Sequence, residues 1–264
     1  MVGPGAWTQE AAGPAGVAAG AGVEATDKQR RSYLPLMTGL LIAVCVAVYA
    51  YDTQAGAGLA QAPGARDIIG GEGFEGLGRL TLFQPSLEFN DEWYRLLTSG
   101  FVHSGAVHLG MNMGLLWLLG RLIEGTFGAL SFGTLFVAGV LGGSVGALLL
   151  DGQAQVGGAS GAIFALMGAA MMIQLLAGQN ILRNGMAPLI AVNVAFSFLP
   201  FVSLGGHLGG LMMGLVAGTA IGLARRSGRA AAAGAPVIVA GLGFVALVLS
   251  IAIADPDAIR AIVG

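Results

Sequence analysis

Residues 128–150 read GALSFGTLFVAGVLGGSVGALLL, a continuous apolar run without a single charged side chain. A helix needs about 17–25 such residues to cross the hydrocarbon core of a bilayer, so this run is long enough. The chain around it has 264 residues, of which 55% are hydrophobic and only 10% charged, and its mean hydropathy is +0.79. Soluble domains carry about 25% charged residues. The composition therefore predicts a protein whose exterior is solvated largely by lipid.

Six further apolar runs lie before and after this one, so seven membrane spans are predicted. Backbone N–H and C=O groups inside lipid must be paired within the protein, which favours helices over loops or open strands. The predicted fold class is an all-α polytopic helical bundle, with a six-helix core and a seventh C-terminal span. The other predicted spans cover residues 34–51, 105–119, 157–176, 187–202, 206–224 and 236–254.

Composition divides the chain into three parts. Residues 1–33 are rich in Ala and Gly without an apolar period, which is typical of a disordered tail. Residues 34–224 hold the predicted six-helix core, and residues 225–264 hold a linker, the seventh span and a short tail. The first apolar run could instead be a cleaved signal. The polar lead before it is long and no A-x-A site follows, so a first membrane span is favoured.

The positive charges predict how the chain is oriented, because cytoplasmic segments of membrane proteins are enriched in Lys and Arg. With the N-terminus cytoplasmic, eight of them lie on the inner side and four on the outer side. The inner set is Lys28, Arg30, Arg31, Arg121, Arg183, Arg225, Arg226 and Arg229, and the outer set is Arg66, Arg79, Arg95 and Arg260. We therefore expect a cytoplasmic N-terminus and an outer C-terminus. The Ala/Gly-rich composition favours a bacterial inner membrane.

Charge and cysteine content argue against several functions. The net charge is −2 without a basic block, which gives no support for nucleic-acid binding. Cys45 is the single cysteine, and one thiol with three histidines is a poor set of metal ligands. No metal, small-molecule cofactor or nucleic-acid partner is expected, and the lipid bilayer is the expected surrounding.

The polar residues within the spans are the candidate functional residues, because burying them in lipid is costly. The three histidines, His103, His108 and His207, lie at the starts of predicted spans, as do Asn112 and Ser160. In the predicted topology the even-numbered spans all begin on the outer side. These five side chains are therefore expected at a similar depth near the outer surface, where they could act together.

Ser160 and His207 each lie among glycines. In Gly157-Gly158-Ala159-Ser160-Gly161 the glycines leave the hydroxyl open, and the first turn of the helix offers unpaired N–H groups for an oxyanion. Before and after His207, glycines recur every four residues and predict a smooth ridge that lets a second helix approach closely. They are Gly206, Gly210, Gly214 and Gly218. Close approach is needed for an imidazole to reach a serine hydroxyl at about 2.6–3.2 Å.

His108 and Asn112 are four residues apart and share one face of a predicted helix, where both could donate hydrogen bonds to an oxyanion. His103 is about 140° around a helix from His108. It is therefore expected to face elsewhere and to brace the preceding loop. Ser144 matches a G-x-S-x-G pattern, but that motif requires a turn between strand and helix. Because Ser144 lies inside an apolar helix, it is expected to be structural.

Four segments resemble motifs of the rhomboid family of intramembrane serine proteases. Phe101–Asn112, FVHSGAVHLGMN, looks like the family's H-x-x-x-x-H-x-x-x-N, and Gly158–Gly161, GASG, looks like its G-x-S-G. Gly206–Gly210, GHLGG, resembles its G-H-x-x-G motif, and Glu92–Thr98, EWYRLLT, is similar to its W-R segment. The order and spacing also agree, over about residues 34–224.

The resemblance implies an activity and a role for each residue. Ser160 would be the nucleophile and His207 its general base, in a dyad without an acidic third member. His108, Asn112 and the backbone N–H of Ser160 would stabilise the oxyanion. Residues implied to shape the site are Gly158, Gly161, Phe164, Gly206 and Gly210, and those implied to be structural are His103, Trp93 and Arg95. Some members have a tyrosine where this chain has Phe164, which can stack on His207 but cannot form a hydrogen bond.

The implied substrates are single-pass transmembrane proteins, cut near the outer interface through an acyl-enzyme. Two other functions would also place polar residues among Gly-rich helices. A small transporter or channel would need polar groups near mid-membrane or inverted repeats, and neither is found in the sequence. A catalytically inactive relative that binds clients would lack the Ser or the His, and both are present.

Overall fold

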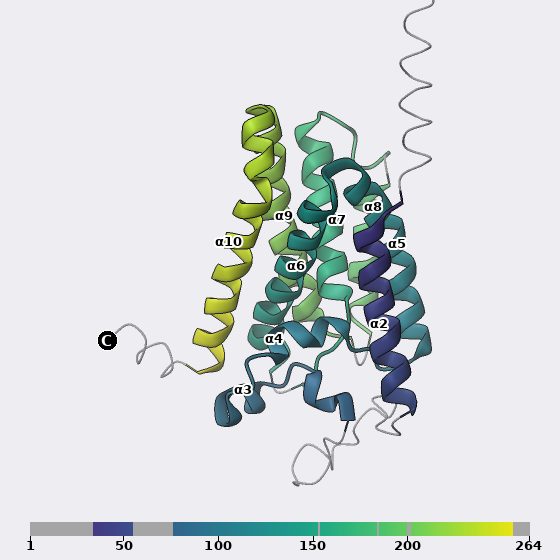
Figure 1. Cartoon of the computed structure of the whole chain (residues 1–264), viewed down its shortest axis with the longest axis vertical. Coiled ribbons are helices and arrows are strands. Elements are labelled where there is room, and N and C mark those ends of the chain that lie inside the picture. The colour runs from purple at the N-terminus through teal and green to yellow at the C-terminus, as the bar shows by residue number, and fades with distance from the viewer. Residues whose placement is uncertain (1–33, 55–75, 153, 184, 200–201, 256–264) are drawn as a thin grey trace, which may run out of the picture. The chain divides into compact units, whose positions relative to one another are not determined.

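The computed structural model describes residues 34–54, 76–152, 154–183, 185–199 and 202–255 (Figure 1). The predicted tail at 1–33, the Gly-rich stretch at 55–75 and residues 256–264 lie outside these ranges. Helices account for the fold, which confirms the predicted all-α class. They are α2 (Leu36–Gln54), α3 (Gln84–Asn90), α4 (Arg95–Thr98), α5 (Ala106–Phe127), α6 (Ala129–Leu150), α7 (Ser160–Leu176), α8 (Met186–Phe196), α9 (Leu204–Arg226) and α10 (Arg229–Ala254), with short 3-10 turns at Gly76–Leu80 and Ser99–Phe101.

Each predicted span corresponds to a helix of the described chain. Five of these helices, α2, α5, α6, α9 and α10, are long and apolar enough to cross a membrane. The other two, α7 and α8, are apolar but have only 17 and 11 residues. The span predicted at 187–202 was too long, because the helix ends at Phe196.

The second span extends past the predicted end at residue 119, to Phe127. The sequence suggested an earlier end because Arg121 and Glu124 interrupt the apolar run. Glu124 is buried, and its carboxylate accepts hydrogen bonds from the backbone N–H groups of Met37 and Thr38, at 2.9 and 2.8 Å. It also accepts the Thr38 hydroxyl at 2.6 Å. A helix start needs such acceptors, so this charge joins α5 to the beginning of α2.

At the centre of the bundle, α9 packs against α7 and α6 mainly through glycines and alanines. A methyl group built on any glycine of the predicted ridge from 210 to 218 would overlap the backbone of α7. The expected close approach is therefore found, and it brings the starts of α7 and α9 together. The pairs are Gly210 with Gly161, Gly214 with Ala165, and Gly218 with Ala169. In Figure 1, α10 packs beside α6 and α9, and α2 beside α5.

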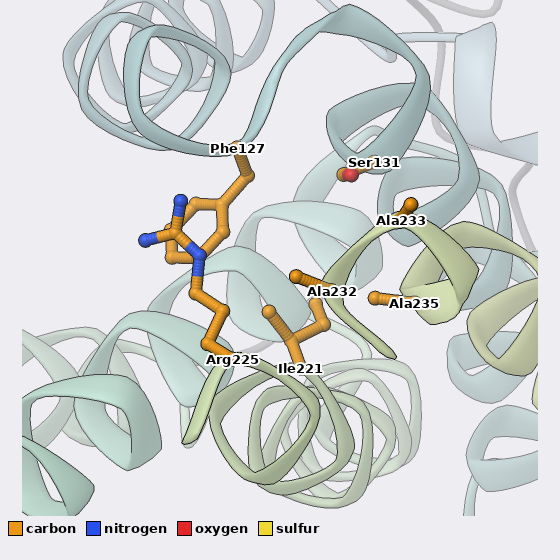
Figure 2. A pocket seen from close by; sticks show the side chains of 7 residues that line it. All are labelled: Phe127, Ser131, Ile221, Arg225, Ala232, Ala233 and Ala235. Carbon is orange, nitrogen blue, oxygen red and sulfur yellow. The ribbon is translucent and has the colours of Figure 1, made fainter. Parts of the chain in front are cut away.

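A cavity of about 290 Å³ lies where α5 and α9 end and α6 and α10 begin (Figure 2). The Arg225 guanidinium lies 4.2 Å from the centre of the Phe127 ring and donates a hydrogen bond to the Thr126 carbonyl at 2.8 Å. The remaining lining residues are mainly alanines. Because Ser160 and His207 lie at the starts of α7 and α9, this cavity is at the other end of the helices.

Candidate active site

Ser160 is the first residue of α7, and its side chain is half-buried. Ala159 precedes it at the cap position and provides no side-chain hydrogen bond to the first turn. The first N–H groups of a helix have no partner within the helix, so they are available to a ligand at this point. Among the described residues, no hydrogen bond involves the Ser160 hydroxyl. A nucleophile must be accessible in this way.

The segment that leads into Ser160 is held by the residues between α2 and α5. Leu82 and Val156 exchange two backbone hydrogen bonds, at 2.8 and 2.9 Å, and form an isolated antiparallel bridge. The Gly158 N–H donates to the Ser99 carbonyl at 2.9 Å. The backbone on both sides of this turn is therefore fixed by residues that come much earlier in the chain.

Gly158 provides the space that the site requires. Its φ of +136° is rare for residues with a side chain. A Cβ atom built there would lie 2.9 Å from Nε2 of His108 and 3.7 Å from Oγ of Ser160. The imidazole of His108 and the Ser160 hydroxyl therefore face the same small space beside Gly158.

His108 and Asn112 lie on one face of α5, as predicted. Nδ1 of His108 lies 3.0 Å from the Ser104 hydroxyl, which leaves Nε2 directed at Gly158. The Asn112 amide donates one N–H to the backbone carbonyl of His108 at 2.8 Å. The amide carries two N–H groups, so one remains for another acceptor.

His207 lies in the first turn of α9 and is 9% exposed. Its imidazole stacks on the ring of Phe164, with 4.3 Å between centroids and 21° between planes. Phe164 is four residues after Ser160, so the two side chains share a face of α7. The imidazole is therefore on the side of α7 that carries the serine. No hydrogen bond joins Ser160 and His207, both of which the structure describes; in unliganded sites such contacts are often long.

Glycines also bring the backbones of Ser160 and His207 close together. A Cβ atom on Gly161 would lie 3.4 Å from the Gly206 carbonyl oxygen. A Cβ atom on Gly210 would overlap the Gly161 carbonyl group. Gly161, Gly206 and Gly210 thus shape the site by removing the width that side chains would add between α7 and α9.

Two polar residues at this end were missed by the sequence analysis. Ser197 follows the last residue of α8, is 2% exposed, and has its Oγ 2.6 Å from Nδ1 of His207. Asp151, at the end of α6, accepts the Gly205 N–H at 3.0 Å and the Ser203 hydroxyl. Serines in apolar helices usually bond to their own backbone, so the sequence carries little signal for such contacts.

His103 differs from its predicted position. It precedes α5, so the helical angle from His108 does not apply, and the two rings lie 5.2 Å apart in an edge contact. Its Nε2 accepts the N–H of Ala159 at 3.4 Å, so it braces the segment before Ser160. Burial, with a smaller contribution from His108, lowers the pKa of His103 to about 4. His103 is therefore neutral near pH 7, as an acceptor must be.

Arg95 and Trp93 lie in the segment between α2 and α5 and stabilise its packing. The Arg95 guanidinium is buried and donates to the carbonyls of Gly78 and Thr81, at 2.8 and 2.9 Å. It also forms an ion pair with Glu92 at 2.6 Å. Trp93 packs against a buried cluster that includes Leu82 and Leu96.

Ser144 is 3% exposed and donates to the Leu96 carbonyl at 2.8 Å. Its hydroxyl is therefore occupied by a packing contact between α6 and α4. Within the described ranges, no group of three or more His, Cys, Asp or Glu side chains could hold a metal ion.

Comparison with known proteins identifies relatives of this chain. The Rhomboid domain family matches residues 90–224, about half of the chain. RHOMBOID-like protein 6, mitochondrial, of Arabidopsis thaliana is 37% identical over 145 residues, which are 52% of this chain and 46% of that protein. Rhomboid protease GluP of Bacillus subtilis is 32% identical over 144 residues, 53% of this chain and 28% of that protein. Inactive RHOMBOID-like protein 8 of Arabidopsis thaliana is 31% identical over 134 residues, 48% and 38% of the two chains.

The chain spans about half or less of the length of these relatives. They come from a plant and a bacterium, so they do not single out the bacterial membrane that the composition suggested. The family match runs from before Trp93 to the last turns of α9 and includes Ser160 and His207. With helices able to cross a membrane and this match, the chain is an integral membrane protein and belongs to the rhomboid family.

Proposed function

We propose that this chain is an intramembrane serine endopeptidase in which Ser160 is the nucleophile and His207 the general base. The observation that carries the proposal is the stack of Phe164 on His207, because Phe164 shares a face of α7 with Ser160. Proteolytic activity of the relative named Rhomboid protease GluP supports the same reaction class. The Ser144 hydroxyl is a poor alternative, since it is buried and already bonded.

The reaction follows from these positions. Nε2 of His207 accepts the proton of the Ser160 hydroxyl as Oγ attacks the scissile carbonyl carbon. The imidazolium then returns that proton to the leaving amine as the C–N bond breaks. Water, deprotonated by the same imidazole, attacks the carbonyl carbon of the acyl-enzyme, and the imidazolium returns the proton to Oγ of Ser160 as the ester bond breaks.

The oxyanion of both tetrahedral intermediates would be stabilised beside Gly158. Nε2–H of His108, the second N–H of Asn112 and the backbone N–H of Ser160 are the donors. Nε2 of His108 faces the space next to the serine, and Asn112 has a second N–H to donate. Donors fixed in position before the reaction stabilise developing charge most, and losing one typically costs about 10²–10³ in rate.

The proposed substrates are single-pass transmembrane proteins in the lipid bilayer. Ser160 begins α7, so it lies at a helix end and not at the middle of a span. A substrate helix would be cut near its outer end, where water for the second step is at hand. Unwinding a helix in lipid exposes unpaired backbone groups, so helices weakened by Gly, Pro or polar residues should be preferred.

Ser160→Ala and His207→Ala should each abolish cleavage of a membrane-anchored model substrate. The double variant should be no worse than either single one, because dyad members act as a unit. Ser144→Ala is the matched control and should keep its activity. A fluorophosphonate probe should label the wild-type protein and not Ser160→Ala. Labelling that survives in Ser160→Ala but is lost in Ser144→Ala would identify a different nucleophile.

The same experiment tests the alternative of an inactive client-binding protein, which the relative named Inactive RHOMBOID-like protein 8 suggests. In that case the wild-type protein would bind a membrane client but neither cut it nor react with the probe. Ser160 and His207, both of which the structure describes, would then form no hydrogen bond with each other even when a client is bound.

We further propose that the N-terminus is cytoplasmic and the C-terminus outside, from the eight-to-four distribution of Lys and Arg. Phe89 is 75% exposed on α3, and Arg226 is exposed at the end of α9. A cysteine introduced at residue 89 should react with an impermeant reagent added outside, and one at residue 226 should not. The reverse labelling pattern would overturn the orientation.

A further inference from the structure

The Ser197–His207 contact is the shortest polar contact of the candidate base in the described chain. Oγ of Ser197 lies 2.6 Å from Nδ1 of His207, and both side chains are buried. The two residues come from different helices, since Ser197 is the C-cap of α8 and His207 lies in the first turn of α9. A hydrogen bond of this length must place one proton between the two atoms, either from the hydroxyl or from the imidazole.

The serine hydroxyl has a second acceptor within reach, so we assign the imidazole as the donor in this contact. Ser197 Oγ lies 3.0 Å from the carbonyl oxygen of Asn193, one turn earlier in α8, and donates to it. A hydroxyl has one proton to donate and two lone pairs to accept with. When it donates to Asn193, its role towards His207 is that of acceptor, and Nδ1 of His207 then carries the hydrogen.

A neutral imidazole has one protonated nitrogen, so Nε2 of His207 is left with a free lone pair. That is the form that a general base needs. With the opposite tautomer, Nε2 would carry a proton and could not accept one from Ser160. We propose that Ser197 is a positioning residue that holds His207 in the Nδ1–H tautomer. This inference rests on the proposed function of the Ser160–His207 pair.

Two contacts then fix the imidazole completely. The stack on Phe164 sets the plane of the ring, but a stacked ring can still turn by 180° within that plane. The bond to Ser197 removes this freedom. After proton transfer Nδ1–H still donates to a neutral oxygen, so Ser197 orients the ring without adding the negative charge that a carboxylate would supply.

The test compares Ser197→Ala with Ser197→Thr, and with Ser144→Ala as the matched control. Ser144 is also buried and also bonds to backbone carbonyls, but it does not touch a histidine. Ser197→Ala should lower kcat by about tenfold to a hundredfold, a part of the about 10²–10⁴-fold that general acid–base catalysis contributes. KM should change less than about threefold, because the substrate does not contact Ser197. Ser197→Thr keeps the hydroxyl and should restore most of kcat, and Ser144→Ala should leave it unchanged.

A direct readout of the tautomer makes the test independent of turnover. The chain has three histidines, so ¹⁵N spectra of histidine-labelled protein are simple, and His207→Asn assigns the signals. His207 should show a protonated Nδ1 in the wild-type protein and a mixture of tautomers in Ser197→Ala. Thermal unfolding of each variant separates this effect from misfolding.

Two outcomes would overturn the inference. One is a protonated Nε2 on His207 in the wild-type protein, and the other is a folded Ser197→Ala variant with full kcat. If Ser160→Ala is inert while Ser197→Ala is fully active, only the role of Ser197 fails. If Ser160→Ala is itself active, the proposed function fails, whereas the spectra still report which nitrogen of His207 carries the proton.

Discussion

Helices α7 and α8 both contact α9, but they do so in different ways. Nine residues of α7 are buried, and its small residues meet the glycines of α9 backbone to backbone. Only Met186 and Ile190 are buried within α8, whereas Val192 and Phe196 are 54% and 50% exposed. One helix is held by close packing along its length, and the other by fewer contacts.

The difference shows how the candidate base acquires its position. Close packing on α7 determines where the backbone of His207 lies, because glycine contacts leave no room for adjustment. A single polar contact from the end of α8 determines which nitrogen of the imidazole is protonated. The backbone position of the base and its protonation thus depend on different neighbours and can be perturbed separately.

Breaking the glycine interface should have the largest effect. A Cβ atom on Gly214 would lie 2.6 Å from the Cα of Ala165, so Gly214→Leu must push α9 away from α7. We expect the variant to lose more than about 3 kcal/mol of stability, the upper part of the range for overpacked cores. Thermal unfolding in detergent, with the yield of folded protein, measures this.

Val192→Leu on α8 adds one methylene group at an exposed position and is the matched control. Its effect should stay within about 0.5 kcal/mol, as for ordinary surface substitutions. Equal losses in Gly214→Leu and Val192→Leu would contradict the contrast between the two interfaces.

Lowering the pH should reduce the stability of the protein by a smaller amount than Gly214→Leu does. The change in pH acts on the polar contact of His103 with Ala159 and not on the packing of α7 and α9. The pKa of His103 is lowered to about 4 in the folded protein, below its usual 6.5. The unfolded chain therefore binds a proton more readily, and stability falls as pH drops from about 6.5 towards 4. Above pH 6.5 this group has no effect.

Thermal unfolding of the wild-type protein and of His103→Gln, at pH 7.5 and pH 4.5, measures the contribution of His103. Glutamine has an acceptor for the Ala159 N–H but does not titrate in this range. The wild-type protein should therefore lose more stability at pH 4.5 than the variant. Identical losses would mean that protonation of His103 is not coupled to folding.

Periodicity and hydropathy predict the helices of this chain well, because an apolar exterior leaves few alternatives to a helix in lipid. The errors occur where a side chain finds a partner far away in the sequence. The second span continues through Glu124 because the backbone N–H and hydroxyl of Thr38, at the start of α2, donate hydrogen bonds to its carboxylate. Hydropathy registers a carboxylate only as an interruption.

The candidate site residues were predicted from polar groups at the starts of spans, beside glycines. Ser197 was missed because its partner, His207, belongs to another helix and the loop between them carries no motif. His103 was assigned the wrong geometry because a helical angle was applied to a residue that precedes α5. Both errors concern orientation, which a one-dimensional pattern does not contain.

The bridge between Leu82 and Val156 has a consequence for synthesis of the protein. The chain leaves the ribosome from its N-terminus, so the backbone N–H and C=O groups of Leu82 are made before those of Val156, with which they form hydrogen bonds. His207 is added about fifty residues later, and α9 must insert between neighbours that already exist. Ser160 and His207 can therefore come together only after α9 has been made.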